Sequence, residues 1–121
     1  MTKILIIEDQ EAMKHLLIRQ IEIMGFVAVS ANNAEDGVKA ATVEKPDLIL
    51  MDLMMPKIDG LKVTRMLRAH PETQGVPILA TSALSRKSDV EACMEAGCTD
   101  SIAKPFTFEE LEIKIRKLIT S

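Results

Sequence analysis

Three acidic residues follow short apolar runs of the sequence and are the first candidates for chemistry. Glu8 and Asp9 follow the run at residues 3–7, and Asp52 follows Leu48–Met51. An aspartate carboxylate can act as a nucleophile toward a phosphoryl group. Carboxylates packed together repel one another, and a hard divalent cation such as Mg²⁺ relieves that repulsion. These residues therefore suit phosphoryl transfer at a magnesium site, with Asp52 as the acceptor.

Two further polar residues occupy equivalent positions later in the chain. Thr81 follows the apolar run at 76–80, and Lys104 follows the run at 101–103. A hydroxyl and an ammonium can bind the oxygens of a phosphoryl group and offset the charge that develops in the transition state. Each residue alone could be a polar group at a solvated strand end. All five at matching positions favour a site.

The elements that must position these residues alternate along the chain. Apolar runs without turn formers predict buried strands, and apolar residues recurring every three or four positions predict helices. We expect strands at 3–7, 26–30, 48–51, 76–80 and 101–103, and helices over 11–24, 34–44, 61–69, 85–96 and from 107 onward. This alternation predicts an α/β fold with a doubly wound parallel sheet and helices on both faces. Sites in such folds lie at the carboxyl ends of the strands.

Capping residues support the predicted helix ends. Asn33, Ser85 and Thr107 are expected N-caps, and Gly25 and Gly97 are expected just beyond two helix C-termini. On the third helix we expect the apolar side chains to be buried, namely Leu61, Met66 and Leu67.

The composition indicates one globular domain spanning residues 1–121. Apolar residues make up 47% and charged residues 27%, and the net charge of −3 gives no electrostatic case for a nucleic-acid partner. Cys93 and Cys98 are expected to be reduced packing residues. The apolar runs are too short for a signal peptide or a membrane span, so we expect a cytoplasmic protein without a membrane partner.

Four motifs resemble those of two-component response regulator receiver domains, in the right order and across the whole chain. They are IIEDQ at 6–10, LILMDLMMPKIDG at 48–60, ILATSA at 78–83 and IAKPF at 102–106. The resemblance implies a flavodoxin-like sheet of order 2-1-3-4-5 with five helices, and a stand-alone domain like the chemotaxis regulators. From the residue count we expect no output domain, because the resemblance covers the whole chain.

The resemblance also implies the roles of individual residues. Asp52 would be the phosphoacceptor, with Mg²⁺ held by Asp9, Asp52 and the Met54 carbonyl, and with Glu8 acting through a bound water. Thr81 and Lys104 would sense the phosphate, and the Lys104–Pro105 bond would be cis. The donor would be a histidine kinase or a histidine phosphotransfer protein, and an unidentified downstream protein would read the signal. The domain would be a switch that promotes its own phosphorylation and dephosphorylation, rather than an enzyme.

Two features of the sequence bear on how partners are recognised. Members of this family usually have an aromatic residue three positions before the lysine, where this chain has Ser101. The first helix has an apolar face wider than packing on one side of a sheet requires. We therefore expect Ala12, Met13 and Leu16 to contact the histidine-bearing partner, and the alternative is that Leu16 belongs to the core.

Three other functions remain open but fit the sequence less well. A phosphatase with an aspartate nucleophile needs a second acid two residues later, where Met54 stands. A flavodoxin-like cofactor carrier needs a phosphate-binding loop and aromatic residues, but this chain has EDQE after its first strand and no Trp or Tyr. An unphosphorylated pseudo-receiver would not need the intact set of five polar residues. His15 and His70 are expected on the surface.

Overall fold

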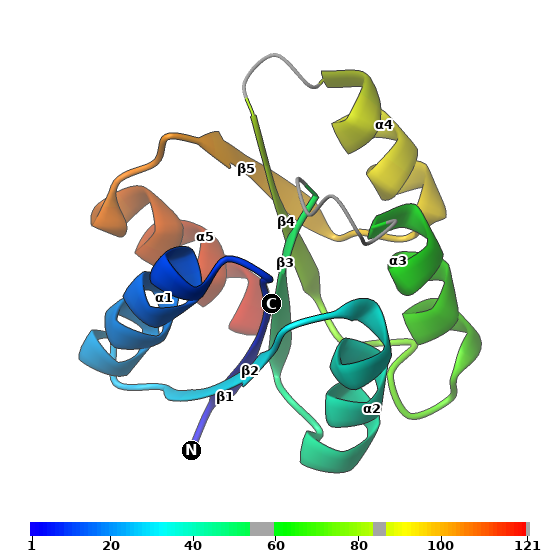
Figure 1. The fold of residues 1–121 in the computed structure, drawn as a ribbon, viewed down its shortest axis with the longest axis horizontal. Helices are drawn as coiled ribbons and strands as arrows, with labels where there is room; N and C mark the ends of the chain where they lie inside the picture. Colours follow the sequence, from blue (N-terminus) through cyan, green and yellow to red (C-terminus); the bar gives the residue numbers. More distant parts are fainter. Residues whose placement is uncertain (54–59, 84–86, 121) are drawn as a thin grey trace.

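The protein folds as a single parallel β-sheet with helices on both faces (Figure 1). The computed structural model describes residues 1–53, 60–83 and 87–120. Within these ranges the sheet has five strands in the order β2-β1-β3-β4-β5, as expected. The strands are β1 (Lys3–Ile7), β2 (Val27–Ala31), β3 (Leu48–Asp52), β4 (Ile78–Ala83) and β5 (Asp100–Lys104).

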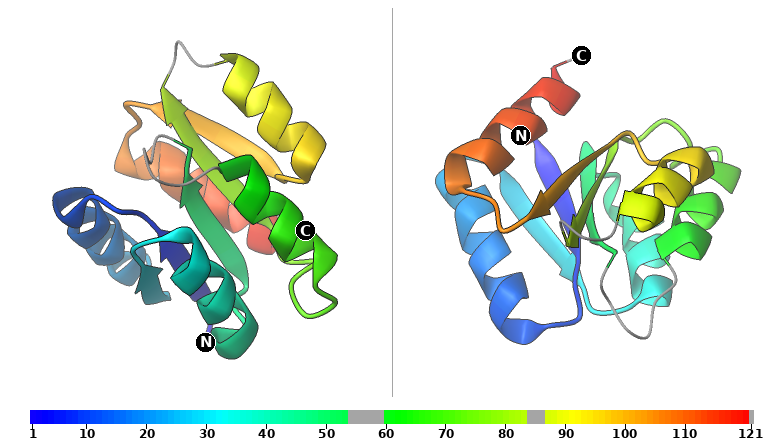
Figure 2. Two further views of the ribbon diagram at one scale, coloured as in Figure 1. Left: turned by 45° about the vertical axis from the view of Figure 1, so that its right-hand side comes forward. Right: turned by 90° about the horizontal axis from the view of Figure 1, so that it is seen from above.

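The helices form two layers that enclose the sheet. They are α1 (Glu11–Ile23), α2 (Ala34–Glu44), α3 (Gly60–Ala69), α4 (Lys87–Ala96) and α5 (Phe108–Ile119). Helices α1 and α5 cover one face, and α2, α3 and α4 cover the other, as Figures 1 and 2 show. None of the helices in the described ranges is long and apolar enough to span a membrane.

The core lies on both faces of the sheet, which explains why the strands read as unbroken apolar runs. All five residues of β3 are buried. Neighbouring strand residues point to opposite faces, so Ile4 and Ile6 pack toward α1 and α5, while Leu5 and Ile7 pack toward α2 and α3. The central strands are thereby fixed from two sides.

The expected helix ends are confirmed where the structure describes them. The Asn33 side chain accepts a hydrogen bond from the Asp36 N–H at 2.9 Å, and Thr107 accepts one from the Glu110 N–H at 3.1 Å. Gly97 follows α4 with a φ of +126°, a conformation that favours glycine. Ser85 lies outside the described residues.

The expected burial on α3 is confirmed for Leu67, is only partial for Leu61, and is wrong for Met66. Met66 is exposed, whereas Leu67 is buried together with Val63 and Thr64. Residues three and four apart share a helix face. The buried face therefore runs through 60, 63, 64 and 67, which turns position 66 outward.

The two cysteines are not separate reduced residues, which corrects the expectation from the sequence. Cys93 and Cys98 form a disulfide. The last turn of α4 and the turn at Gly97 bring their Cα atoms to 5.6 Å, inside the range that a disulfide can bridge. The bond joins α4 to the segment that enters β5.

Candidate functional site

Asp52 lies at the carboxyl end of the central strand, and its side chain is only 7% exposed. In the parallel register between β3 and β4, Asp52 pairs with Thr81. The Thr81 hydroxyl is buried and donates a hydrogen bond to Asp52 Oδ1 at 3.5 Å. The predicted proximity of this hydroxyl and this carboxylate is therefore confirmed, with the two residues on adjacent strands.

Lys104 reaches the same carboxylate from a strand farther away. It is the last residue of β5, where it pairs with Ala83 of β4. Its ammonium Nζ lies 3.2 Å from Asp52 Oδ2, and its peptide bond to Pro105 is cis. Asp52 thus has a hydroxyl near one oxygen and an ammonium near the other.

Glu8 follows β1 and is completely buried beside this site. Burial is the main cause that raises the pKa of its carboxyl to about 7, because a buried carboxylate loses its hydration. The Gln10 N–H donates to Glu8 Oε2 at 3.2 Å and partly offsets the rise in pKa. The negative charge of Asp52 raises this pKa further, and the Lys104 ammonium lowers it. A hydrogen bond with Asp52 also raises this pKa, so the two carboxyls repel each other when both are ionised and interact favourably when Glu8 is protonated.

The acidic end of the site has unsatisfied oxygens. Glu8 Oε1 and Asp9 Oδ1 are both buried and have no hydrogen-bond partner among the described residues. A buried carboxylate oxygen without a partner is costly, and a cation would relieve that cost. Among the described residues, no group of three or more acidic, histidine or cysteine side chains forms a complete metal cluster. Mg²⁺ needs only one or two protein carboxylates together with water, so the donor set fits this ion.

The expected third protein ligand cannot be placed. Met54 belongs to residues 54–59, which lie outside the described residues. The structure thus brings together Asp52, Thr81 and Lys104 by direct contacts, and it adds Glu8 through the electrostatic interaction. Asp9 enters as the neighbour of Glu8 with an unsatisfied oxygen.

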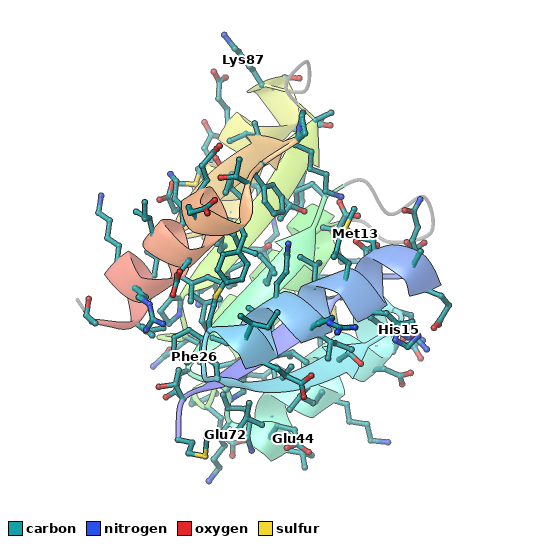
Figure 3. All side chains as sticks on the ribbon, turned by 90° about the vertical axis from the view of Figure 1, so that its left-hand side faces the viewer. Met13, His15, Phe26, Glu44, Glu72 and Lys87 are labelled. Carbon is teal, nitrogen blue, oxygen red and sulfur yellow. A yellow bond between two sulfur atoms is a disulfide. The ribbon has the colours of Figure 1, made fainter. Side chains whose placement is uncertain are left out.

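The three expected docking residues lie on the outer part of α1. Ala12 is exposed, Met13 is half-buried, and Leu16 is 50% exposed, so Leu16 is not core. Leu17, one position later, is buried at 3% exposure. His15 is also on the surface of α1, as expected, where it pairs with Glu11 at 3.3 Å (Figure 3).

A groove of about 380 Å³ lies between α1 and the segment after β5. It is lined by Met13, Leu16, Leu17, Gln20, Ala83, Lys104, Pro105 and Phe106. Because Lys104 contacts Asp52, the groove adjoins the acidic site. Gln20 and Phe106 were not expected in this groove, although the spacing of Met13, Leu17 and Gln20 along α1 indicates a common face.

A second cavity lies beside Ser101, the position at which members of the family usually have an aromatic side chain. It measures about 350 Å³ and is lined by Ser82, Ala83, Lys87, Val90, Glu91, Ser101 and Ala103. These residues come from β4, α4 and β5. Ser82 directly follows Thr81, so the cavity borders the end of β4 that carries the site hydroxyl.

The chain matches the response regulator receiver domain family over residues 4–116. It is 38% identical over 117 residues to a probable transcriptional regulator, ycf27, of Porphyridium aerugineum, and the match covers 97% of this chain and 48% of that protein. It is 34% identical to the alkaline phosphatase synthesis transcriptional regulatory protein PhoP of Bacillus subtilis, with coverage of 97% and 48%. The chain thus spans about half the length of these curated relatives.

Solved structures agree with this assignment. The receiver domain of a sensor histidine kinase from Pseudomonas aeruginosa PAO1 superposes with a TM-score of 0.91 at 32% identity, over 99% of this chain and 98% of that one. That protein has a magnesium ion coordinated in its active site cleft. The chemotaxis response regulator CheY4 of Vibrio cholerae, at 20% identity, shares the fold with a TM-score of 0.89 over 98% of each chain. By its sequence match and its fold, this chain belongs to the response regulator receiver domains of two-component systems.

Proposed function

We propose that this receiver domain accepts a phosphoryl group on Asp52 from a phosphohistidine of a histidine kinase or histidine phosphotransfer protein. The observation that carries the proposal is the pairing of Asp52 with Lys104 at 3.2 Å, with the Thr81 hydroxyl on the other carboxylate oxygen. A nucleophile that is nearly buried yet faces one ammonium and one hydroxyl is suited to an anionic electrophile.

The transfer forms one bond and breaks one. An oxygen of Asp52 attacks phosphorus, the bond between phosphorus and the donor imidazole nitrogen breaks, and an aspartyl phosphate remains. Lys104 would bind a phosphoryl oxygen in place of its present contact with the carboxylate. Thr81 would donate its hydroxyl hydrogen to another phosphoryl oxygen. These two contacts would distinguish the phosphorylated from the unphosphorylated protein.

The acidic end of the site supports a role for Mg²⁺. Asp9 and Asp52 would hold the ion directly and Glu8 through a water, and the Met54 carbonyl is the further ligand that the family resemblance implies. When bound, the ion would neutralise negative charge on the transferring group and on the carboxylates. The unsatisfied oxygens of Glu8 and Asp9 support this assignment.

The partner proposals rest on the surface of α1. Ala12, Met13 and Leu16 would dock the histidine-bearing protein. Met13 and Leu16 line the groove that also contains Lys104, and Ala12 is exposed at the preceding position of α1. The domain would promote its own phosphorylation and dephosphorylation as a cytoplasmic switch. A further protein would read the phosphorylated state, and Ser101 implies a readout without the aromatic side chain that is usual in the family.

Acetyl phosphate provides a test that needs no cognate kinase. The protein is incubated with acetyl phosphate and Mg²⁺, and its intact mass is measured. We expect the addition of one phosphoryl group, and no addition when a chelator is present during the incubation. Asp52→Asn should show no addition while keeping its circular dichroism spectrum. Equal phosphoryl uptake by this variant would overturn the proposal.

A further inference from the structure

Helix α4 has fewer buried residues than any of the other four helices, and its buried residue belongs to the disulfide. Cys93 is the one buried residue among the ten of α4, all of which the structure describes. The neighbouring positions Met94 and Glu95 are exposed. A helix with so little buried apolar surface opens locally at low free-energy cost. Interactions that fix Cys93 therefore also restrain α4.

Cys98, the other cysteine of the disulfide, lies in a segment that is hydrogen-bonded to α3 and to the sheet. Arg68 of α3 donates through Nε to the Gly97 carbonyl at 2.9 Å and through Nη1 to the Val76 carbonyl at 2.7 Å. Thr99 makes two hydrogen bonds with Ile78 of β4, each 2.9 Å long. Residues 97–99 are thus fixed to α3 and to the sheet by bonds that do not involve α4. The bond from Cys98 to Cys93 ties a weakly held helix to this fixed segment.

The surroundings of the sulfur atoms suit both oxidation states. Thr64 of α3 donates its only hydroxyl hydrogen to the Gly60 carbonyl at 2.7 Å. The same oxygen lies 3.7 Å from Cys93 Sγ and 3.6 Å from Cys98 Sγ. Its remaining lone pairs can therefore accept a hydrogen bond from a thiol once the disulfide is reduced. A reduced pair would gain this bond instead of leaving a polar group unsatisfied.

We propose that Cys93 and Cys98 form a reversible thiol–disulfide site that fixes α4 when oxidised and releases it when reduced. The reductant is a low-molecular-weight thiol. Its thiolate attacks one cysteine sulfur and the disulfide bond breaks, which leaves a mixed disulfide and one cysteine thiolate that takes up a proton. A second thiol then displaces the remaining cysteine. Overall, two thiols are oxidised to one disulfide, and the cysteine pair gains two electrons and two protons.

The site gives the domain a second input that is independent of the phosphoryl group. Helix α4 borders the cavity beside Ser101 and Ala103 through Lys87, Val90 and Glu91. Intracellular disulfides are uncommon, and those that occur are often transient and redox-sensing. A change in the oxidation state of Cys93 would act on the face formed by α4 and β5.

Thiol counting on the wild-type protein tests the chemistry. The protein is equilibrated with mixtures of glutathione and glutathione disulfide, denatured in N-ethylmaleimide, and weighed as intact protein. We expect no adducts under oxidising conditions, two under reducing conditions, and a single reversible transition between them in monomeric protein. Two adducts under oxidising conditions, stable glutathione adducts, or covalent dimers would overturn the proposal.

Hydrogen exchange tests the structural consequence in the same samples. Amides of α4 should exchange severalfold faster in the reduced protein, whereas amides of α2 serve as the internal control and should not change. Cys98→Ala retains the packing of Cys93 but cannot form the bond. It should exchange in α4 like reduced wild type and should not respond to dithiothreitol. Equal exchange of α4 in oxidised and reduced wild type would overturn the claim that the bond fixes this helix.

Discussion

The ammonium of Lys104 lies 3.2 Å from Asp52 Oδ2, although the two residues are 52 positions apart in the sequence. They belong to strands that are not neighbours, because β4 lies between β3 and β5. The long lysine side chain therefore spans one strand to reach the carboxylate. This positive charge opposes the repulsion between Asp52 and Glu8.

Removal of the lysine charge should destabilise the folded protein. Lys104→Met keeps most of the apolar stem but leaves the Asp52 and Glu8 carboxylates without the nearby ammonium. Breaking a largely buried ion pair costs up to about 3–5 kcal/mol, and partial exposure of Lys104 reduces this to about 1–3 kcal/mol. Urea unfolding measures the change. Lys114→Met, which removes a more exposed pair with Asp100, is the control and should cost under about 1 kcal/mol. Equal losses for the two variants would contradict the prediction.

Magnesium should stabilise the protein against heat through its acidic residues. At about 100 times its dissociation constant, Mg²⁺ should add roughly 2.7 kcal/mol to the free energy of unfolding. Asp9→Ala should lose most of this gain, because it removes one of the two unsatisfied carboxylate oxygens recorded among the described residues at the site. Glu72→Ala is the control, since Glu72 is exposed in the segment before β4, at the opposite edge of the sheet (Figure 3). A response of Asp9→Ala equal to that of the control would place the metal elsewhere.

Stability without metal should fall as the pH rises. Burial raises the pKa of Glu8 from its ordinary value of 4.5 to about 7. Between these values the folded protein binds more protons than the unfolded chain, so the free energy of unfolding decreases with increasing pH. The decrease should be at most about 3 kcal/mol between pH 4.5 and pH 8. Glu8→Gln cannot titrate at this position.

Thermal unfolding in a chelator checks this prediction at several pH values. The difference in melting temperature between Glu8→Gln and wild type should grow in favour of the variant as the pH rises from about 4.5 to 7, and should level off above pH 7. Well below pH 4.5 the carboxyl is protonated in both states of wild type, so its contribution to the difference should vanish. A difference independent of pH would show that Glu8 does not titrate in this range.

Variants of Leu16 and Leu17, which are adjacent on α1, distinguish a role in docking from a role in core packing. Leu16→Ala should change the melting temperature little and leave labelling by acetyl phosphate intact, because this side chain is 50% exposed. It should strongly reduce transfer from a cognate kinase, since a partly exposed apolar residue beside the site would anchor the partner. Leu17→Ala is the matched control and should cost about 2–5 kcal/mol, because Leu17 is buried. Unchanged kinase transfer with Leu16→Ala would rule out its docking role.

The arrangement of the sheet and the main site contacts could be predicted from the sequence. Apolar runs identified the strands, and the carboxyl ends of parallel strands share one edge. That rule alone brings Asp52 and Lys104 to the same edge of the sheet. The order of the strands came from the family resemblance, because alternation of strands and helices alone permits more than one order.

Features set by side-chain packing could not be predicted in this way. A lysine on an amphipathic helix is ordinarily solvated, but Lys14 is buried, and its ammonium binds the Glu11 carboxylate and the Asn32 side chain. A lysine stem can pack against apolar neighbours when its ammonium finds such partners. The hydrogen bonds from Arg68 to distant carbonyls depend on how α3 meets the loops beside it. Sequence spacing contains no such information.

The central claim is that Asp52 itself carries the phosphoryl group, and borohydride trapping tests it most directly. Reduction of an aspartyl phosphate converts that residue to homoserine, which peptide mass mapping can locate. After incubation with acetyl phosphate and Mg²⁺, we predict homoserine at position 52 and unmodified aspartate at positions 9 and 47. Homoserine at another position, or none at position 52 in protein whose intact mass shows a phosphoryl group, would contradict the account.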